Sequence, residues 1–233
     1  MTNIKELFSE LRTRKLYALL LSLQILDLFA LLVLSEIVIQ GKLNIPMPVV
    51  HLLQFTIILA LNLLAVIFIK RFVQNRFYLY SFIFLFLLSL CLVFITETPA
   101  GAGIDRALAK VLSFLGHVAQ FTCLCLLLAV ITRDIFQERH DLTYSLTGAT
   151  CIFILIGTIF GILYSLFEIL SPGMIFFPGS NTLRTCIIHS FYILSGQESP
   201  VENLNMVIRN LSIFESIFAN LYAVMVVGKL MSK

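Results

Sequence analysis

The chain has 233 residues, of which 59% are hydrophobic and only 12% are charged, and its mean hydropathy is +0.99. These values exclude a soluble globular domain, in which about a quarter of the residues are charged. The net charge of +3 at pH 7 gives no indication of a nucleic-acid partner. The composition predicts an all-α integral membrane protein embedded in a lipid bilayer.

The first fifteen residues, 1–15, are expected to form an amphipathic helix that lies in the cytoplasmic interface of the membrane. Ile4, Leu7, Phe8 and Leu11 fall on one helical face, and charged residues occupy the other positions. A solvated tail is the alternative interpretation of this pattern. The apolar run that follows is too long for a cleavable signal peptide and continues as a span.

Six apolar stretches are long enough to cross a hydrocarbon core, which needs about 20 helical residues. The predicted transmembrane helices are 16–39, 49–69, 77–95, 111–131, 145–170 and 206–228. The first four are expected to form a bundle, residues 16–139, and the rest a second unit, residues 140–233. The loops are too short to hold a soluble catalytic domain.

Basic residues are distributed unequally between the loops. With both termini in the cytoplasm, eleven of the sixteen Lys and Arg residues fall on the cytoplasmic side, as the positive-inside rule requires. They are Lys5, Arg12, Arg14, Lys15, Lys70, Arg71, Arg76, Arg133, Arg139, Lys229 and Lys233. We therefore expect a multi-pass protein with both ends inside the cell.

The first four helices are not a conventional voltage sensor. Such a device needs basic residues at every third position of one span, because only charge that moves through the field responds to voltage. The fourth span has none, and its polar members are His117, Gln120 and Thr122. His117 and Gln120, with Gln54 and Asn62 of the second span, are expected to hydrogen-bond between helices.

Two acids lie inside predicted spans, where ionisable groups are costly. Asp27 is in the middle of the first span, and Glu215 lies about a third of the way along the last. Either could carry protons, or could be held by hydrogen bonds or by water; for Glu215 the partner could be the preceding segment or a neighbouring subunit. The five cysteines are expected to pack as small apolar side chains, with no disulfide and no metal site.

The segment between the fifth and sixth spans does not have the pattern of an ordinary loop. After Pro172-Gly173, residues 181–194 have apolar side chains at helical spacing behind Asn181, a favourable N-cap. Fourteen residues are too few to cross the membrane. The pattern predicts a re-entrant helix surrounded by protein or a water-filled cavity, with a surface amphipathic helix as the alternative.

These features resemble bacterial membrane proteins in which a two-helix potassium-channel pore domain follows four further helices. The matching positions before the pore helix are Asp141, Tyr144, Gly148, Leu163, Tyr164, Leu166, Glu168 and Pro172-Gly173. The last helix matches at Arg209, Leu211, Glu215, Leu221, Tyr222 and Leu230. The resemblance implies a homotetramer in the bacterial inner membrane, with a pore helix that includes Ser190, Phe191 and Leu194.

The chain departs from this family at the selectivity filter. Ser195, Gly196, Gln197 and Glu198 stand before Pro200, and about four residues that include the Gly-Tyr pair of the family are absent. Potassium selectivity needs stacked rings of backbone carbonyls, which a segment this short cannot supply. We therefore expect a pore that does not select potassium.

Three functions remain open for the sequence. The first is a homotetrameric pore that passes monovalent cations, with Gln197 and Glu198 at its mouth. The second is a non-conducting relative that has a structural or partner-binding role in the membrane. The third is a transporter in which Asp27 or Glu215 carries protons. No catalytic triad or metal-spaced cluster occurs in the sequence, so neither an enzyme nor a cofactor is expected.

Overall fold

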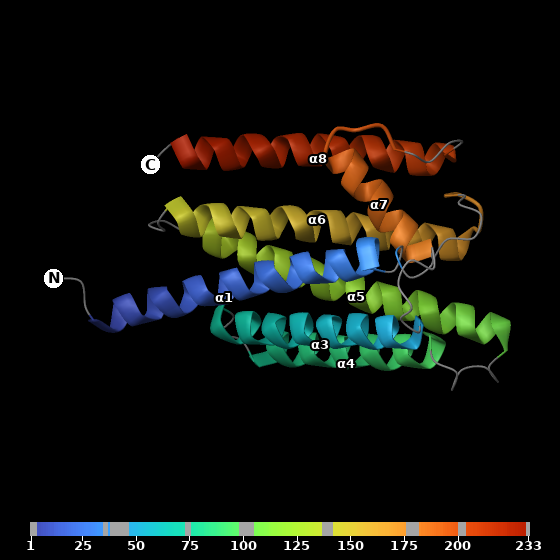
Figure 1. Ribbon diagram of the computed structural model, residues 1–233, viewed down its shortest axis with the longest axis horizontal. Helices are drawn as coiled ribbons and strands as arrows, with labels where there is room; N and C mark the ends of the chain where they lie inside the picture. The colour runs from blue at the N-terminus through green and yellow to red at the C-terminus, as the bar shows by residue number, and fades with distance from the viewer. Residues whose placement is uncertain are drawn as a thin grey trace.

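The computed structural model describes residues 4–34, 37, 47–72, 76–97, 105–136, 142–175, 182–199 and 204–231. These residues form helices and no strand, so the predicted all-α class is confirmed for the described part of the chain. In chain order the elements are α1 (Ile4–Leu28), the π-helix η1 (Phe29–Leu34), α3 (Met47–Phe72), α4 (Arg76–Glu97), α5 (Arg106–Phe136), α6 (Leu142–Leu170), α7 (Thr182–Leu194) and α8 (Met206–Met231) (Figure 1).

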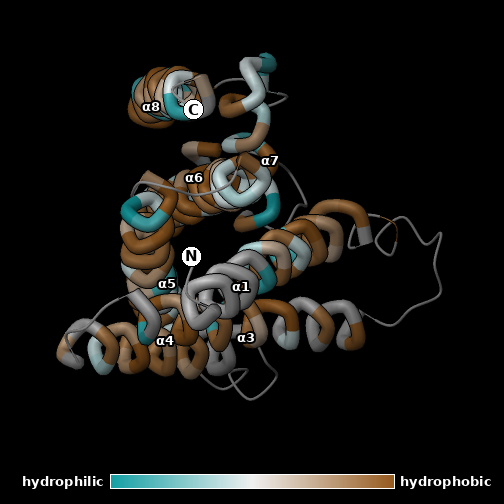
Figure 2. The backbone as a smooth tube through the Cα atoms, turned by 90° about the vertical axis from the view of Figure 1, so that its left-hand side faces the viewer, coloured by the Kyte–Doolittle hydropathy of each residue, from teal (hydrophilic) through white to brown (hydrophobic). Residues whose placement is uncertain are grey.

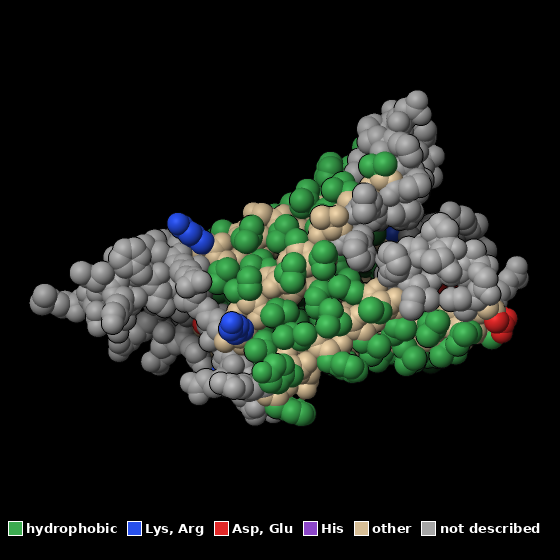
Figure 3. All heavy atoms as spheres, turned by 90° about the horizontal axis from the view of Figure 1, so that it is seen from below, with side chains coloured by type: hydrophobic (Ala, Val, Ile, Leu, Met, Phe, Trp, Pro, Cys, Tyr) green, Lys and Arg blue, Asp and Glu red, His purple; other side chains and the backbone are tan. Residues whose placement is uncertain are grey.

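Four helical stretches are long and apolar enough to cross a membrane: Lys15–Val33, Ala107–Phe136, Leu142–Leu170 and Met206–Lys229. The apolar stretches that the described residues form in α3 and α4 are shorter, Thr56–Lys70 and Leu79–Leu92. Large hydrophobic side chains are exposed on α1 and on every helix from α3 to α8, and they cover most of the described surface in Figure 3. Length and composition therefore identify a multi-pass membrane protein.

The long helices lie side by side, with α3 and α4 at one edge of the bundle and α8 at the other (Figure 1). Seen along the helices, α1 lies between the α3–α4 pair and α6, and α7 lies between α6 and α8 (Figure 2). The first turn of α1 and the last turn of α8 lie at the same end of the bundle.

A buried acid joins three helices at this end. The hydroxyl of Tyr17 on α1 donates a hydrogen bond of 2.8 Å to Oδ2 of Asp134 on α5, and the hydroxyl of Tyr144 on α6 donates to the same oxygen. The Tyr17 ring also packs edge-on against Phe68 of α3, with 4.9 Å between the ring centroids. Tyr144, one of the positions that carry the resemblance, thus helps to hold the helices together. Asp141, another of those positions, lies outside the described residues.

The segment predicted to lie in the membrane interface and the first span form one continuous helix, α1. No glycine or proline occurs between Ile4 and Leu28, so nothing in the local sequence breaks the helix at residue 15. The side chains of residues 4–14 lie outside the description, and their amphipathic face remains a prediction. The helix changes to π geometry at Phe29, two residues after Asp27.

Candidate functional site

The half-length helix expected between the last two spans is α7. Its 13 residues extend about 20 Å, which is less than the roughly 30 Å of a hydrocarbon core. It is inclined between α6 and α8 in Figure 1 and lies close to both in Figure 2. The Asn181 cap expected for this helix lies outside the described residues.

Two glycines let α6 and α7 approach each other closely. A Cβ atom on Gly161 would lie 2.6 Å from Cγ1 and 2.8 Å from the backbone Cα of Ile187. A Cβ atom on Gly157 would lie 2.7 Å from the ring of Phe191 and 2.9 Å from Leu194. The four-residue spacing of these glycines is a known signal for close helix packing in membranes, and the sequence-based prediction did not use it.

Glu215 lies at the centre of the contact between α6, α7 and α8. Its side chain is 0% exposed. The hydroxyl of Tyr164 on α6 donates to Glu215 Oε2 at 2.6 Å, and Ser190 Oγ on α7 lies 2.5 Å from Glu215 Oε1. The serine hydroxyl also lies 2.8 Å from the backbone oxygen of Gly157. The acid on α8 is therefore held by the two elements that precede it in the chain.

Further hydrogen bonds extend from this acid to the loop after α7. Tyr164 also contacts Ser212 Oγ at 3.2 Å, and Nε2 of His189 lies 2.9 Å from the same oxygen. On the other side of the ring, Nδ1 of His189 lies 2.6 Å from Ser199 Oγ. We call Tyr164, His189, Ser190, Ser199, Ser212 and Glu215 the polar cluster. Its hydroxyl, imidazole and carboxyl groups form one continuous chain that is able to hold or pass a proton.

Two members of the polar cluster, Ser199 and Ser212, were not predicted. Ser212 stands three residues before Glu215 and therefore shares its helical face, a spacing that could have identified it. Ser199 reaches His189 only because the chain turns back after α7, and no local pattern predicts this contact. His189 is buried on α7, and both of its ring nitrogens lie within hydrogen-bond distance of serine hydroxyls.

A helix cap stands at residues 195–197, where a filter was expected from the resemblance. Gly196 has a φ of +71°, its N–H donates to the carbonyl of Ile193 at 3.0 Å, and the N–H of Gln197 donates to the carbonyl of Tyr192 at 2.9 Å. These two bonds define a Schellman motif, in which a left-handed glycine terminates a helix. The hydroxyl of Ser195 also donates to the carbonyl of Tyr192 at 2.9 Å. The described backbone here is thus a compact cap and not an extended strand.

The predicted pore residues divide into two groups. Ser190 and Leu194 are buried and Phe191 is partly buried, and all three pack toward α6. The four mouth residues, 195–198, are exposed. Asp27 lines a cavity between α1, α3, α4, α5 and α6, and no residue of either group lines that cavity. The structure therefore brings Glu215 against Ser190 of α7, whereas Asp27 lines the cavity.

Local capping fixes the turn after α6 and the start of α8. The carboxylate of Glu168 accepts hydrogen bonds from the N–H groups of Gly173 at 2.6 Å and Ile175 at 2.8 Å, which holds the turn after α6. The side chain of Asn205 accepts from the N–H of Val207 at 3.0 Å and so caps the start of α8. Within the described residues, no group of three His, Cys, Asp or Glu side chains could hold a metal ion.

Comparisons with protein-family models, with curated proteins and with solved structures found no match for this chain.

Proposed function

We propose that the chain is an ion-channel-like membrane protein in which residues 140–233 of four copies surround a cation pore that does not select potassium. In this proposal all six apolar stretches cross the membrane and both termini face the cytoplasm. The helix α7 is the re-entrant pore helix, and the long helix α8 is the inner helix beside the axis.

One observation carries the proposal: a short helix is locked by buried hydrogen bonds between two long apolar helices and ends in a closed cap. The bonds of Glu215 to Tyr164 and Ser190 fix α7 and α8 relative to α6. The cap at Gly196 uses the N–H groups of Gly196 and Gln197 to satisfy helix carbonyls. A selective filter would need those backbone groups in an extended strand with its carbonyls directed at the axis.

The surface of α8 supports assembly with other copies. Among the described side chains of α8, only a narrow seam is buried. Successive residues of this seam are alternately four and three positions apart: Ile208, Ser212, Glu215, Ala219 and Tyr222. The remaining surface keeps large apolar side chains exposed, and they include Ile213, Phe214, Ile217, Leu221 and Val224. A helix packed by one seam leaves its other faces available for neighbouring subunits or lipid.

The position of the helix ends supports the proposed topology. The first turn of α1 and the last turn of α8 lie at one end of the bundle (Figure 1). An even number of crossings places both ends of a chain on one side of a membrane. Six crossings with the basic loops inside satisfy both this geometry and the positive-inside rule.

Glu198 provides the test of cation preference. It is exposed two residues after the cap, and four copies would form an acidic ring, which favours cations. After reconstitution in planar bilayers under a KCl gradient, the reversal potential should lie toward the potassium equilibrium value. Glu198→Gln should move it toward the chloride value, whereas Asp105→Asn, which removes an exposed acid at the start of α5, should leave it unchanged. Equal potentials for Glu198→Gln and wild type would contradict the ring.

A non-conducting scaffold is the second candidate function, and the cap itself favours it. The bulky side chains of Tyr192, Ile193 and Leu194 directly precede the cap, and a closed cap without filter carbonyls offers an ion no replacement for its water shell. In the same bilayer experiment, a folded tetramer that carries no current would establish this candidate in place of the pore.

A further inference from the structure

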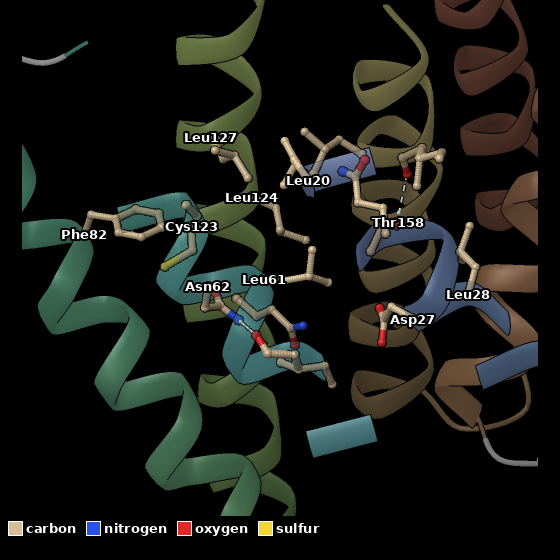
Figure 4. A pocket seen from close by; sticks show the side chains of 16 residues that line it. Leu20, Asp27, Leu28, Leu61, Asn62, Phe82, Cys123, Leu124, Leu127 and Thr158 are labelled. Atoms are coloured by element: carbon tan, nitrogen blue, oxygen red, sulfur yellow. Dashed lines mark hydrogen bonds between the residues drawn. The ribbon is translucent and has the colours of Figure 1, made fainter. Parts of the chain in front are cut away.

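A cavity of about 50 Å³ lies between the N-terminal bundle and α6, and none of its lining residues belongs to the polar cluster or the cap. Its wall is mostly apolar, but five polar side chains from four helices line it: Gln24, Asp27, Asn62, Gln120 and Thr158. Figure 4 shows Asp27 on the α1 side of the cavity and Asn62 on the α3 side. Asn62, Gln120 and Thr158 stand near the middle of α3, α5 and α6, whereas Gln24 and Asp27 lie in the last five residues of α1, just before η1.

The polar lining includes oxygen acceptors, while Asn62, Thr158 and Gln24 each direct one donor hydrogen to a backbone carbonyl and the two amides keep a second N–H. Asn62 Nδ2 and the hydroxyl of Thr158 each donate to the backbone carbonyl four residues earlier, at 2.7 Å and 3.0 Å. Gln24 Nε2 donates to the carbonyl of Cys151 at 3.5 Å. Gln24 is only 5% exposed, and its Oε1 is buried without a hydrogen-bond partner among the described residues. The cavity wall thus includes a buried acceptor that has no donor among the described residues.

Asp27 adds the negative charge. No hydrogen bond or ion pair joins its carboxylate to any residue that the structure describes. The guanidinium group of Arg184 reaches the same segment of the chain, but it donates to the carbonyl of Leu32 in η1, at 3.2 Å. A carboxylate in the middle of a membrane bundle is costly unless a positive group or a proton neutralises it.

We infer that this cavity binds a single monovalent alkali cation, held by the Asp27 carboxylate and by neutral side-chain oxygens of Gln24, Asn62 and Thr158. Alkali and alkaline-earth cations are hard ions that take oxygen ligands. One carboxylate balances one positive charge, whereas a divalent ion would leave an uncompensated charge in an apolar interior. The volume equals roughly three water-sized spaces, which accommodates the ion and part of its water shell.

The backbone next to Asp27 is consistent with a binding role. The α-helix changes to the π-helix η1 two residues after Asp27. Single π turns in α-helices are rare and occur frequently at functional sites, because the altered hydrogen-bond register frees backbone groups and redirects side chains. The site lies in the membrane interior and is independent of the proposed pore, so it can be tested without any current measurement.

The test is ion-specific stabilisation of the purified full-length protein in detergent. The midpoint of thermal unfolding is measured while LiCl, NaCl, KCl or RbCl replaces choline chloride at constant total salt. At least one alkali ion should raise the midpoint saturably, by about 2 °C or more, because a ligand that binds only the folded state stabilises it. An equal midpoint in all salts, choline included, would overturn the inference, as would a larger saturable rise with CaCl₂ or MgCl₂.

Three variants locate the effect. Asp27→Asn should abolish the ion-specific rise, and Thr158→Val, which keeps the side-chain shape, should raise the half-saturating concentration roughly three- to tenfold. Asp105→Asn, an acid-to-amide change at an exposed position outside the cavity, should keep the wild-type response. A full response in both Asp27→Asn and Thr158→Val would place the ion elsewhere and overturn the assignment. If Asp27→Asn does not fold, the wild-type salt series and Thr158→Val still decide the question.

Discussion

At the scale of single residues, the hydroxyl of Tyr164 is one of two side-chain donors within hydrogen-bond distance of the Glu215 carboxyl group. Tyr164→Phe removes this hydroxyl and leaves a fully buried acid with one donor fewer. We expect the free energy of unfolding to fall by about 1–3 kcal/mol, the cost of an unsatisfied buried polar group. Thermal or chemical unfolding in detergent measures this loss.

Tyr192→Phe is the matched control for that change. Tyr192 is 37% exposed, and its hydroxyl makes no hydrogen bond to another described residue. Its loss should change the free energy of unfolding by less than about 0.5 kcal/mol. Equal effects of Tyr164→Phe and Tyr192→Phe would mean that the buried hydrogen bond contributes nothing to stability.

The sequence could identify Glu215 as an unusual residue but could not identify its partners. An acid within an apolar run is visible in the sequence, whereas Tyr164 and Ser190 lie 51 and 25 positions away. Their approach depends on how α6, α7 and α8 pack, and that packing depends on glycine positions that hydropathy does not register. Asp27 was likewise visible, but the cavity needs side chains from five helices.

At the scale of the elements, the contact between α6 and α7 requires a glycine at position 161. In Gly161→Ala the new Cβ would meet the backbone of Ile187, which cannot move aside by rotating a side chain. We expect a loss of about 1–3 kcal/mol in the free energy of unfolding, typical of overpacking. The measurement is the unfolding midpoint of the purified variant.

Gly228→Ala in α8 serves as the control for this substitution. No atom lies within 4 Å of the Cβ position there, so only the helix propensity changes. Alanine should stabilise the helix by about 0.5–1 kcal/mol. If Gly161→Ala proves as harmless as Gly228→Ala, the close approach of α6 and α7 does not govern stability.

The helices themselves follow from the sequence, because long apolar runs bounded by Pro, Gly and charged residues define them. Helices occur in all six predicted stretches and at the predicted short segment. The cap at Gly196 was harder to predict. A glycine with positive φ suits both a selectivity filter and a Schellman motif, and residue spacing alone does not distinguish the two. The π turn at Phe29–Leu34 has no sequence signal that we recognise.

At the scale of the whole molecule, three polar centres lie among the apolar helices that the structure describes: Asp134 with its two tyrosines, the polar cluster, and the cavity at Asp27. The polar cluster fixes the short helix α7 between α6 and α8, and the cavity at Asp27 lies among α1, α3, α4, α5 and α6. Arg184 on α7 donates a hydrogen bond to the carbonyl of Leu32 in η1, so α7 contacts the segment that follows Asp27.

The central claim, a cation pore without potassium selectivity, is tested most directly by the reversal potential with KCl on one side of the bilayer and NaCl on the other. Because the cap at Gly196 replaces a filter strand, the account predicts cation current that reverses close to 0 mV. A reversal potential displaced by about 59 mV or more, which corresponds to a tenfold preference for potassium at one charge, would contradict it.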